Sequence, residues 1–152
     1  MSSVAWQQFL ISQGAQFNES GEASFAAPEF AASETPASGQ LFDLSVNGLI
    51  AVSGADAQTF LQGQFTNDIK QVAEAAQFTG YCTAKGRLLA LFYAFSINEI
   101  IYLQCPRALI PDLVKRLRMF VMRSKVVVED ASEQFVCLGL ASADSAAHIE
   151  HL

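Results

Sequence analysis

The feature that most restricts the fold is a stretch of the chain in which short apolar segments are separated by tight polar turns. The segments are residues 77–83, 88–97 and 100–105, and the turns are Ala84-Lys85-Gly86-Arg87 and Asn98-Glu99. Apolar and aromatic segments of this length, joined by short turns, are typical of antiparallel hairpins. The stretch therefore predicts a three-strand meander.

Helices are predicted before and after this meander in the sequence. A short helix is expected after Gly54, and it carries Phe60 and Leu61. Asp56 lies near its start, where a carboxylate favours the free backbone N–H groups. A longer helix is expected over residues 107–122. Its predicted buried side consists of Leu109, Leu113, Leu117, Phe120 and Val121, with Lys115, Arg116 and Arg118 facing outward.

The remaining elements complete the expected order. Strands are predicted over residues 125–129 and 134–141, and a helix over residues 142–152. With a first strand in residues 41–53, the order β-α-β-β-β-α-β-β-α indicates an α+β fold. Such a fold is a mostly antiparallel sheet with helices packed on one face. The Asn47-Gly48 pair within the first strand is interpreted either as a hairpin turn or as a kink or bulge in one long strand.

Composition divides the chain into three parts. Residues 1–40 hold a short helix and then a mobile loop, because residues 14–40 are rich in Ala, Ser, Glu, Gly and Pro and have few apolar anchors. Residues 41–133 are the α+β domain. Residues 134–152 are the start of a second, truncated unit, whose apolar strand needs pairing partners on both sides. We therefore expect the functional form to include further sequence or another copy of the chain.

The balance of charges argues against several classes of partner. The formal net charge of −6 means that strong direct binding to nucleic acid is not expected. No run of about 18 apolar residues offers a membrane span, and a cytoplasmic location is expected. Positive charge is concentrated in one cluster, which is either the solvated face of a helix or a docking patch for an anionic ligand, RNA or an acidic partner. The cluster consists of Lys115, Arg116, Arg118, Arg123 and Lys125.

The residues alone predict neither a catalytic group nor a metal site. Cys82, Cys105 and Cys137 are odd in number and form no Cys-x-x-Cys pair, so they are expected to be packing residues in a reducing compartment. His148 and His151 lie three residues apart without a companion cluster of metal ligands. No phosphate-binding loop, dinucleotide-binding glycine motif or Gly-x-Ser-x-Gly turn is present.

Three segments together resemble the YgfZ-type folate-binding proteins, which are relatives of the glycine-cleavage T-protein. The segments are Phe-Leu-Gln-Gly-Gln-Phe-Thr-Asn-Asp-Ile at residues 60–69, Tyr-Cys-Thr-Ala-Lys-Gly-Arg at residues 81–87, and Met-Phe-Val-Met-Arg-Ser-Lys-Val at residues 119–126. The first resembles a strand-to-helix entry that T-proteins and YgfZ-type proteins share. The other two are similar to Cys-Asp-Ala-Lys-Gly-Lys and Tyr-Val-Phe-Arg-Ser-Lys-Val of the YgfZ-type proteins. The resemblance covers about residues 41–140.

The resemblance implies a ring of three small domains around a channel that takes tetrahydrofolate. It also implies a role in supporting iron–sulfur enzymes, including a tRNA-modifying enzyme. The family's hallmark is a Lys-Gly-Cys-aromatic-x-Gly-Gln-Glu motif, which this sequence does not contain. The chain is expected to be the amino-terminal portion of such a protein, and to bind tetrahydrofolate weakly or not at all by itself.

T-proteins differ from this chain at the positions that carry out catalysis. They have Asn-Glu-x-Gly-Gly-x-x-Asp-Asp after the same strand, and the second Asp lies beside the reactive folate nitrogen. Alignment on Gly86 places Ala90 at the first Asp and Leu91 at the second. Leucine has no proton to exchange and no charge to stabilise a developing cation, so the resemblance implies that aminomethyl transfer is lost. Core packing is a second sufficient reason for Leu91.

The same alignment implies that Asn47, Phe78, Leu91 and Tyr93 line the folate side of the sheet, with Phe78 at the position of a T-protein tyrosine. Leu91 and Tyr93 share a face because strand side chains alternate with period two. Tyr93 combines an apolar ring with a hydroxyl, as a pterin pocket requires. The alternative for Tyr93 is a buried ring whose hydroxyl is hydrogen-bonded in the core.

Lys85 and Arg87 flank a tight turn. They either meet the glutamate tail of folate or a partner, or they belong to a solvated turn. The leading hypothesis is a folate-binding accessory protein without turnover. A folate-dependent aminomethyltransferase of the T-protein type is the alternative, and a structural module whose site lies in other sequence is the third.

Overall fold

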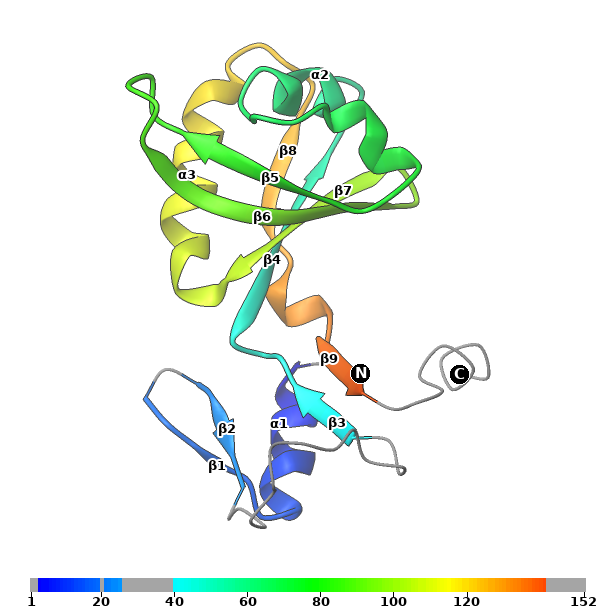
Figure 1. Ribbon diagram of the computed structural model, residues 1–152, viewed down its shortest axis with the longest axis vertical. Coiled ribbons are helices and arrows are strands. Elements are labelled where there is room, and N and C mark those ends of the chain that lie inside the picture. Colours follow the sequence, from blue (N-terminus) through cyan, green and yellow to red (C-terminus); the bar gives the residue numbers. More distant parts are fainter. Residues whose placement is uncertain (1–2, 20, 26–39, 142–152) are drawn as a thin grey trace. The chain divides into compact units, whose positions relative to one another are not determined.

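The computed structural model describes residues 3–19, 21–25 and 40–141. The chain forms two compact units, residues 47–133 and residues 1–46 together with 134–152 (Figure 1). The boundary predicted at residue 41 therefore falls before a short segment, residues 41–46, that lies in the smaller unit.

The larger unit is a five-stranded antiparallel sheet with helices on one face (Figure 1). Its elements are β4 (Asn47–Ser53), α2 (Ala57–Gln62), η1 (Ile69–Ala73), β5 (Gln77–Cys82), β6 (Leu88–Ile97), β7 (Ile100–Pro106), η2 (Arg107–Leu109), α3 (Ile110–Val121) and β8 (Val127–Asp130). The strand order is β5-β6-β7-β4-β8, and every neighbouring pair is antiparallel. The predicted α+β class and the predicted meander, β5-β6-β7, are both confirmed.

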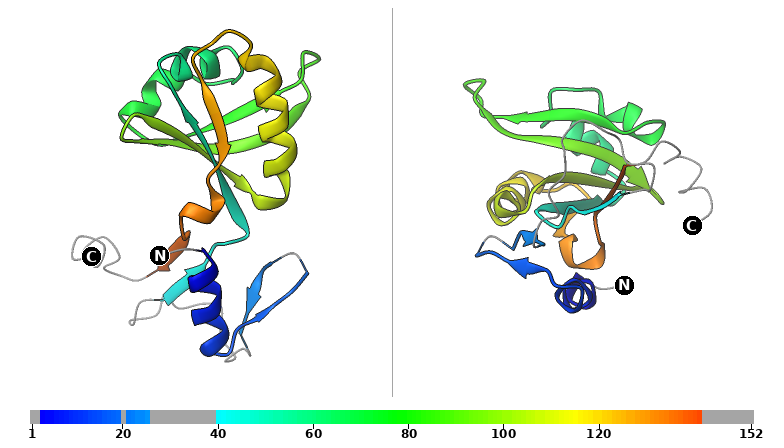
Figure 2. Two further views of the ribbon diagram at one scale, coloured as in Figure 1. Left: turned by 180° about the vertical axis from the view of Figure 1, so that it is seen from behind. Right: turned by 60° about the horizontal axis from the view of Figure 1, so that its bottom comes forward.

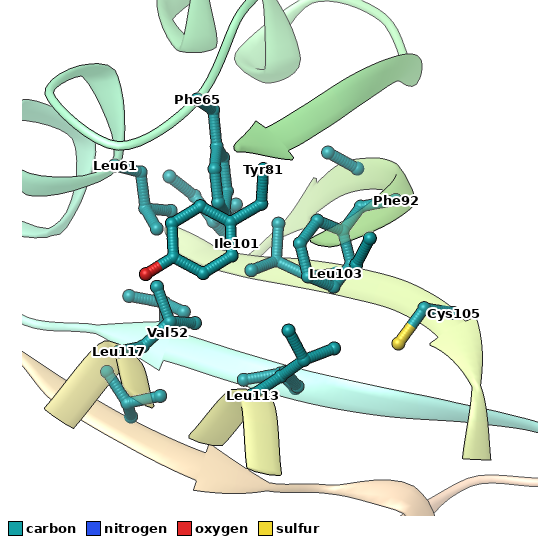
Figure 3. Packing of buried hydrophobic residues seen from close by; sticks show 14 of the residues in the cluster. Val52, Leu61, Phe65, Tyr81, Phe92, Ile101, Leu103, Cys105, Leu113 and Leu117 are labelled. Carbon is teal, nitrogen blue, oxygen red and sulfur yellow. The ribbon is translucent and has the colours of Figure 1, made fainter. Parts of the chain in front are cut away.

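The helices bury one face of this sheet. α3 runs beside β8 and β4 (Figure 2). The rings of Phe65, Tyr81 and Phe92 gather with Leu113 and Leu117 of α3 in one cluster (Figure 3). Phe65 lies with its ring centroid 5.5 Å from that of Tyr81 and 5.3 Å from that of Phe92. This packing ties the loop after α2 to the sheet.

The buried side of α3 differs from the predicted one by a small rotation of the helix. Its buried residues are Ile110, Leu113, Val114 and Leu117, at the i, i+3, i+4, i+7 spacing of one helix face. The predicted members Leu109 and Phe120 are exposed instead. Leu109 belongs to the 3₁₀ turn η2, whose tighter winding changes which residues share a face with α3.

Backbone contacts fasten the turn after α3 to the turn before α2. Gly54, at φ +110°, passes so close to the carbonyl of Lys125 that no Cβ would fit. The Asp56 carboxylate accepts a hydrogen bond from the Lys125 backbone N–H at 2.7 Å. Asp56 was predicted to favour the start of α2, but its side chain makes no capping hydrogen bond there. The Asp56 carboxylate instead binds the turn after α3.

The smaller unit has its own cluster and two short sheets. Its elements are α1 (Ser3–Ser12), β1 (Gln16–Phe17), β2 (Ala23–Ser24), β3 (Gln40–Asp43) and β9 (Leu138–Ala141), with η3 (Ser132–Gln134) at the boundary. Trp6 and Leu10 of α1 are buried with Ala15, and the Trp6 indole N–H donates to Asp43 at 2.9 Å. β3 pairs antiparallel with β9.

The structure differs from the sequence predictions at Asn47-Gly48 and at residues 134–141. Asn47 and Gly48 form neither a hairpin turn nor a kink or bulge in one long strand. They are the first residues of β4, where they pair in regular register with β7, and the preceding strand β3 belongs to a different sheet. The strand predicted at residues 134–141 begins only at Leu138, after the 3₁₀ turn η3. The predicted helix at 142–152, and residues 26–39 of the predicted mobile loop, lie outside the described residues.

Candidate functional site

The face of the sheet opposite the helices carries large apolar side chains in the open. Along β6, Ala90 and Phe92 point into the core, at 4% and 0% exposure. The alternate residues Leu91 and Tyr93 are 53% and 40% exposed. The interpretations of Leu91 as a core residue and of Tyr93 as a buried tyrosine are therefore wrong. Their predicted position on a shared face is confirmed.

Strand register brings aromatic rings together on this open face. Phe78 of β5 pairs with Tyr93 of β6, and their ring centroids lie 5.1 Å apart. Phe95 continues the row, 6.4 Å from Tyr93 and 5.5 Å from Tyr102 of β7. Phe78 is 61% exposed, so the row is most open at its β5 end. Aromatic rings of this kind offer a flat apolar surface for another ring system.

A cavity of about 370 Å³ lies where this row meets the start of β4. It is lined by Asn47, Phe78, Leu91, Tyr93, Gln104, Cys105 and Pro106. Four of the six predicted site residues are thus brought together, from three strands. Sequence reasoning missed the β7 members. Gln104 pairs with Tyr93 and Pro106 pairs with Asn47 in the sheet. This strand register would have indicated both residues, but the sequence prediction did not include it.

Lys85 and Arg87 are not brought to this cavity. Both are exposed on the turn between β5 and β6. The turn is closed by a hydrogen bond from the Thr83 N–H to the Arg87 carbonyl at 2.8 Å, and Gly86 takes a φ of +74°. Only a residue without Cβ adopts such a backbone conformation readily, which explains the glycine. Neither cation lines the cavity.

The cavity is suited to binding and stacking rather than to acid–base chemistry. None of its lining residues is an acid, a lysine, an arginine or a histidine. Burial raises the pKa of the Cys105 thiol to about 12, which keeps the sulfur protonated and unreactive at neutral pH. Ala90, which the resemblance aligns with the first T-protein aspartate, is buried on the opposite face. The part of the chain that the structure describes holds no cluster of three potential metal ligands.

A second cavity, of about 590 Å³, lies near the β6–β7 turn and was not anticipated from the sequence. Its lining includes Gly54, Gln58, Ser96 and Glu99. Glu99 supplies its one carboxylate, and the cavity holds no aromatic residue. It therefore lacks the stacking surface that distinguishes the open sheet face.

The basic cluster is not uniformly outward-facing. Arg116 is half-buried, with its guanidinium 5.8 Å from the Tyr81 ring centroid and 5.9 Å from that of Phe120. The prediction that Arg116 faces outward is therefore wrong, because cation–π packing holds it against the core. The Arg118 Nε–H donates to the Val128 carbonyl at 2.7 Å and so caps one group of the edge strand β8.

Comparison with known proteins gives both a fold and a family of relatives. No family model matches the chain. By structure it is similar to the glycine cleavage system aminomethyltransferase T from Bartonella henselae, with a TM-score of 0.77 and 19% identity over 96% of this chain and 42% of that one. The fold is therefore that of the T-protein aminomethyltransferases.

By sequence the chain is similar to proteins named tRNA-modifying protein YgfZ. The Photobacterium profundum protein is 32% identical over 111 residues, covering 72% of this chain and 33% of the relative. The Colwellia psychrerythraea protein is 33% identical over 94 residues, covering 61% and 29%. The resemblance to the YgfZ-type proteins is thus confirmed. The chain spans about a third of the length of these relatives. Among the described residues, no helix is long and apolar enough to cross a membrane.

Proposed function

We propose that the chain is part of a tetrahydrofolate-binding accessory protein that has no turnover of its own. The observation that carries this proposal is the cavity on the open sheet face, where Asn47, Phe78, Leu91 and Tyr93 meet. The resemblance implied these four residues as one wall of a folate site. Folate supplies a bound one-carbon unit, and the chain supplies the surface that holds it.

The residues present fit one ring system of such a ligand. The Phe78–Tyr93 pair offers a stacking surface for a flat pterin ring. Asn47 and Gln104 add amide groups, which provide both donors and acceptors for the polar edge of a pterin. The volume of about 370 Å³ lies at the lower end of the roughly 300–1,000 Å³ typical of ligand pockets. We therefore expect the ring to dock here and the glutamate tail to extend beyond the cavity.

The side chains at the cavity support the proposed absence of turnover. The resemblance aligns Leu91 with the second T-protein aspartate, and no lining residue of the cavity is a carboxylate or a histidine. A transfer reaction needs a group that moves a proton or stabilises the developing charge. Aminomethyl transfer, the alternative function, would need such a group, and the lining of this cavity does not supply one. The similar proteins are named tRNA-modifying proteins, and this supports tRNA modification as the setting. Support of iron–sulfur enzymes is part of the same proposal.

Calorimetric titration of this chain with 5-formyl-tetrahydrofolate tests the proposal. The chain spans about a third of its relatives' length, and one exposed wall cannot bury the ~70–90% of a ligand's surface that a complete pocket buries. We expect a dissociation constant of roughly millimolar, about −4 kcal/mol. Micromolar binding with sedimentation as a monomer would contradict the proposal that this chain provides a single wall. Aminomethyl transfer by the chain would contradict the absence of turnover.

A further inference from the structure

The outward side of α3 carries a second regular stripe. Lys115, Arg118 and Met119 follow the i, i+3, i+4 spacing on the side of α3 away from the buried stripe, and Met122 is the residue at the end of the helix. Met119 is 62% exposed and Met122 is 88% exposed. The outer side of a helix facing only water is usually polar, whereas this one combines cations with long apolar side chains.

Along the sequence, the charges near this stripe are of one sign, and the Asp56 carboxylate that binds the Lys125 backbone N–H is an acidic group beside them in the fold. Residues 113–128 contain five Lys and Arg residues and no Asp or Glu, in a chain whose net charge is −6. Two of the five are already engaged, because Arg116 packs on Tyr81 and Phe120 and Arg118 bonds the Val128 carbonyl. The other three, Lys115, Arg123 and Lys125, are exposed. We call Lys115, Met119, Met122, Arg123 and Lys125 the α3 patch.

The patch is held in shape by the backbone. Met122 ends α3 at a φ of +45°, a conformation that costs free energy for a residue with a side chain and so must be imposed by its surroundings. The Ser124 N–H donates to the Val121 carbonyl at 2.9 Å, and the Lys125 N–H donates to the Asp56 carboxylate at 2.7 Å. These contacts fix the direction in which the chain leaves the helix. A surface fixed in this way loses less entropy when a partner binds.

From these observations we propose that the α3 patch is a docking surface for an acidic amphipathic segment of a partner protein. Positive charge alone would suit phosphate groups equally well, but phosphates leave the exposed methionines without a role. Methionine and arginine are both enriched at protein–protein interfaces, and methionine adapts to irregular apolar partners. A helix with Asp or Glu beside Leu, Ile or Phe matches both components of the patch. The site is separate from the folate cavity, with which it shares no residue.

Selection from a phage-displayed library of random peptides tests this proposal. The bait is the chain itself, and the counter-selection uses the Met119→Ser/Met122→Ser double variant. Both methionines are more than half exposed, so the variant is expected to melt at the same temperature as the unchanged chain. We expect the recovered peptides to carry Asp or Glu at helical spacing next to an apolar stripe. Recovery of non-acidic peptides, or of none that distinguish the two baits, would overturn the proposal.

Variants then separate the charged and the apolar parts. The synthetic form of a recovered peptide should bind at least about tenfold more weakly to Met119→Ser/Met122→Ser and to Lys115→Gln/Arg123→Gln. The matched control Lys70→Gln/Leu88→Ser changes one exposed cation and one exposed apolar residue elsewhere, and binding to it should be unchanged. An oligouridylate RNA is titrated in parallel. RNA binding that depends on Lys115 and Arg123 but not on the methionines would overturn the proposal in favour of a phosphate-binding surface.

Discussion

The two faces of the five-stranded sheet are built from alternate residues of the same strands, but they differ in how far their large apolar side chains are exposed. On the helix-covered face, Phe92 and Leu103 are fully buried among other apolar side chains. On the open face, Phe78, Leu91 and Tyr93 are equally large and 40–61% exposed. Large apolar groups left in the open on a sheet mark a surface that binds something. The covered face stabilises the fold, and the open face is the candidate for function.

Placing a carboxylate on each face in turn is expected to give the largest difference in stability between the two faces. Phe92→Asp removes a fully buried ring and leaves an unpaired charge in the core, which should cost more than about 4 kcal/mol and unfold the domain. Leu91→Asp changes the adjacent residue, which is 53% exposed, and should change stability by less than about 1 kcal/mol. Thermal melts of both variants measure the difference.

Leu91→Asp also tests the open face against the core interpretation. A large loss of melting temperature in this variant would mean that Leu91 is buried and that the open face is core. The variant should not gain aminomethyl transfer, because one carboxylate does not supply the enclosed site that such a reaction needs.

A smaller effect is expected from a close approach on the covered side of β4. A Cβ at Gly48 would lie 2.6 Å from the Ser132 Oγ and 2.9 Å from the Ile110 Cγ1, so Gly48→Ala forces a shift and should cost about 1–3 kcal/mol. Gly63 is the matched control, since its φ is −79° and the nearest atom to its Cβ would be 3.5 Å away. Urea denaturation should find Gly63→Ala within about 0.5 kcal/mol of the unchanged chain. Equal effects of the two substitutions would refute the close approach.

The smallest effect concerns the pH dependence of stability. Burial raises the pKa of Cys105 to about 12 from an ordinary 9.0, so the folded chain keeps a proton that the unfolded chain releases above pH 9. Stability therefore falls as pH rises through this window, by about 1.4 kcal/mol between pH 8 and pH 10. Cys105→Ala lacks this contribution. The difference in free energy of unfolding between the unchanged chain and this variant should therefore change by about 1.4 kcal/mol between pH 8 and pH 10. Parallel curves for the two proteins would show that the thiol titrates normally.

The fold was largely predictable because its signals are local. The meander follows from alternating apolar segments and from the turn at Asn98 and Glu99, both of which take positive φ values. The shared face of Leu91 and Tyr93 follows from the period of a strand alone. The position of Asn47 and Gly48 at the start of a separate strand was not predictable in this way. It depends on β3 pairing with the distant β9, a contact that no local pattern encodes.

The candidate site was predictable only in part, for a related reason. A resemblance placed four residues on one wall, but Gln104 and Pro106 reach the same cavity through cross-strand register. The exposure of Leu91 depends on which face the helices cover, and alternation leaves that choice open. The inward turn of Arg116 depends on its packing against Tyr81, a contact between distant segments.

The most direct test of the central claim is an NMR titration of the isotope-labelled chain with 5-formyl-tetrahydrofolate up to several millimolar. Amide signals should shift in a saturable way at Asn47, Phe78, Leu91 and Tyr93, and a control residue on the covered side, Leu117, should not respond. Tyr93→Ala, which removes one ring of the stacking pair, should abolish the shifts while the fold persists. Shifts centred on the cavity around Gly54 and Glu99, or no shift at all, would contradict the assignment of the open face as the folate-binding wall.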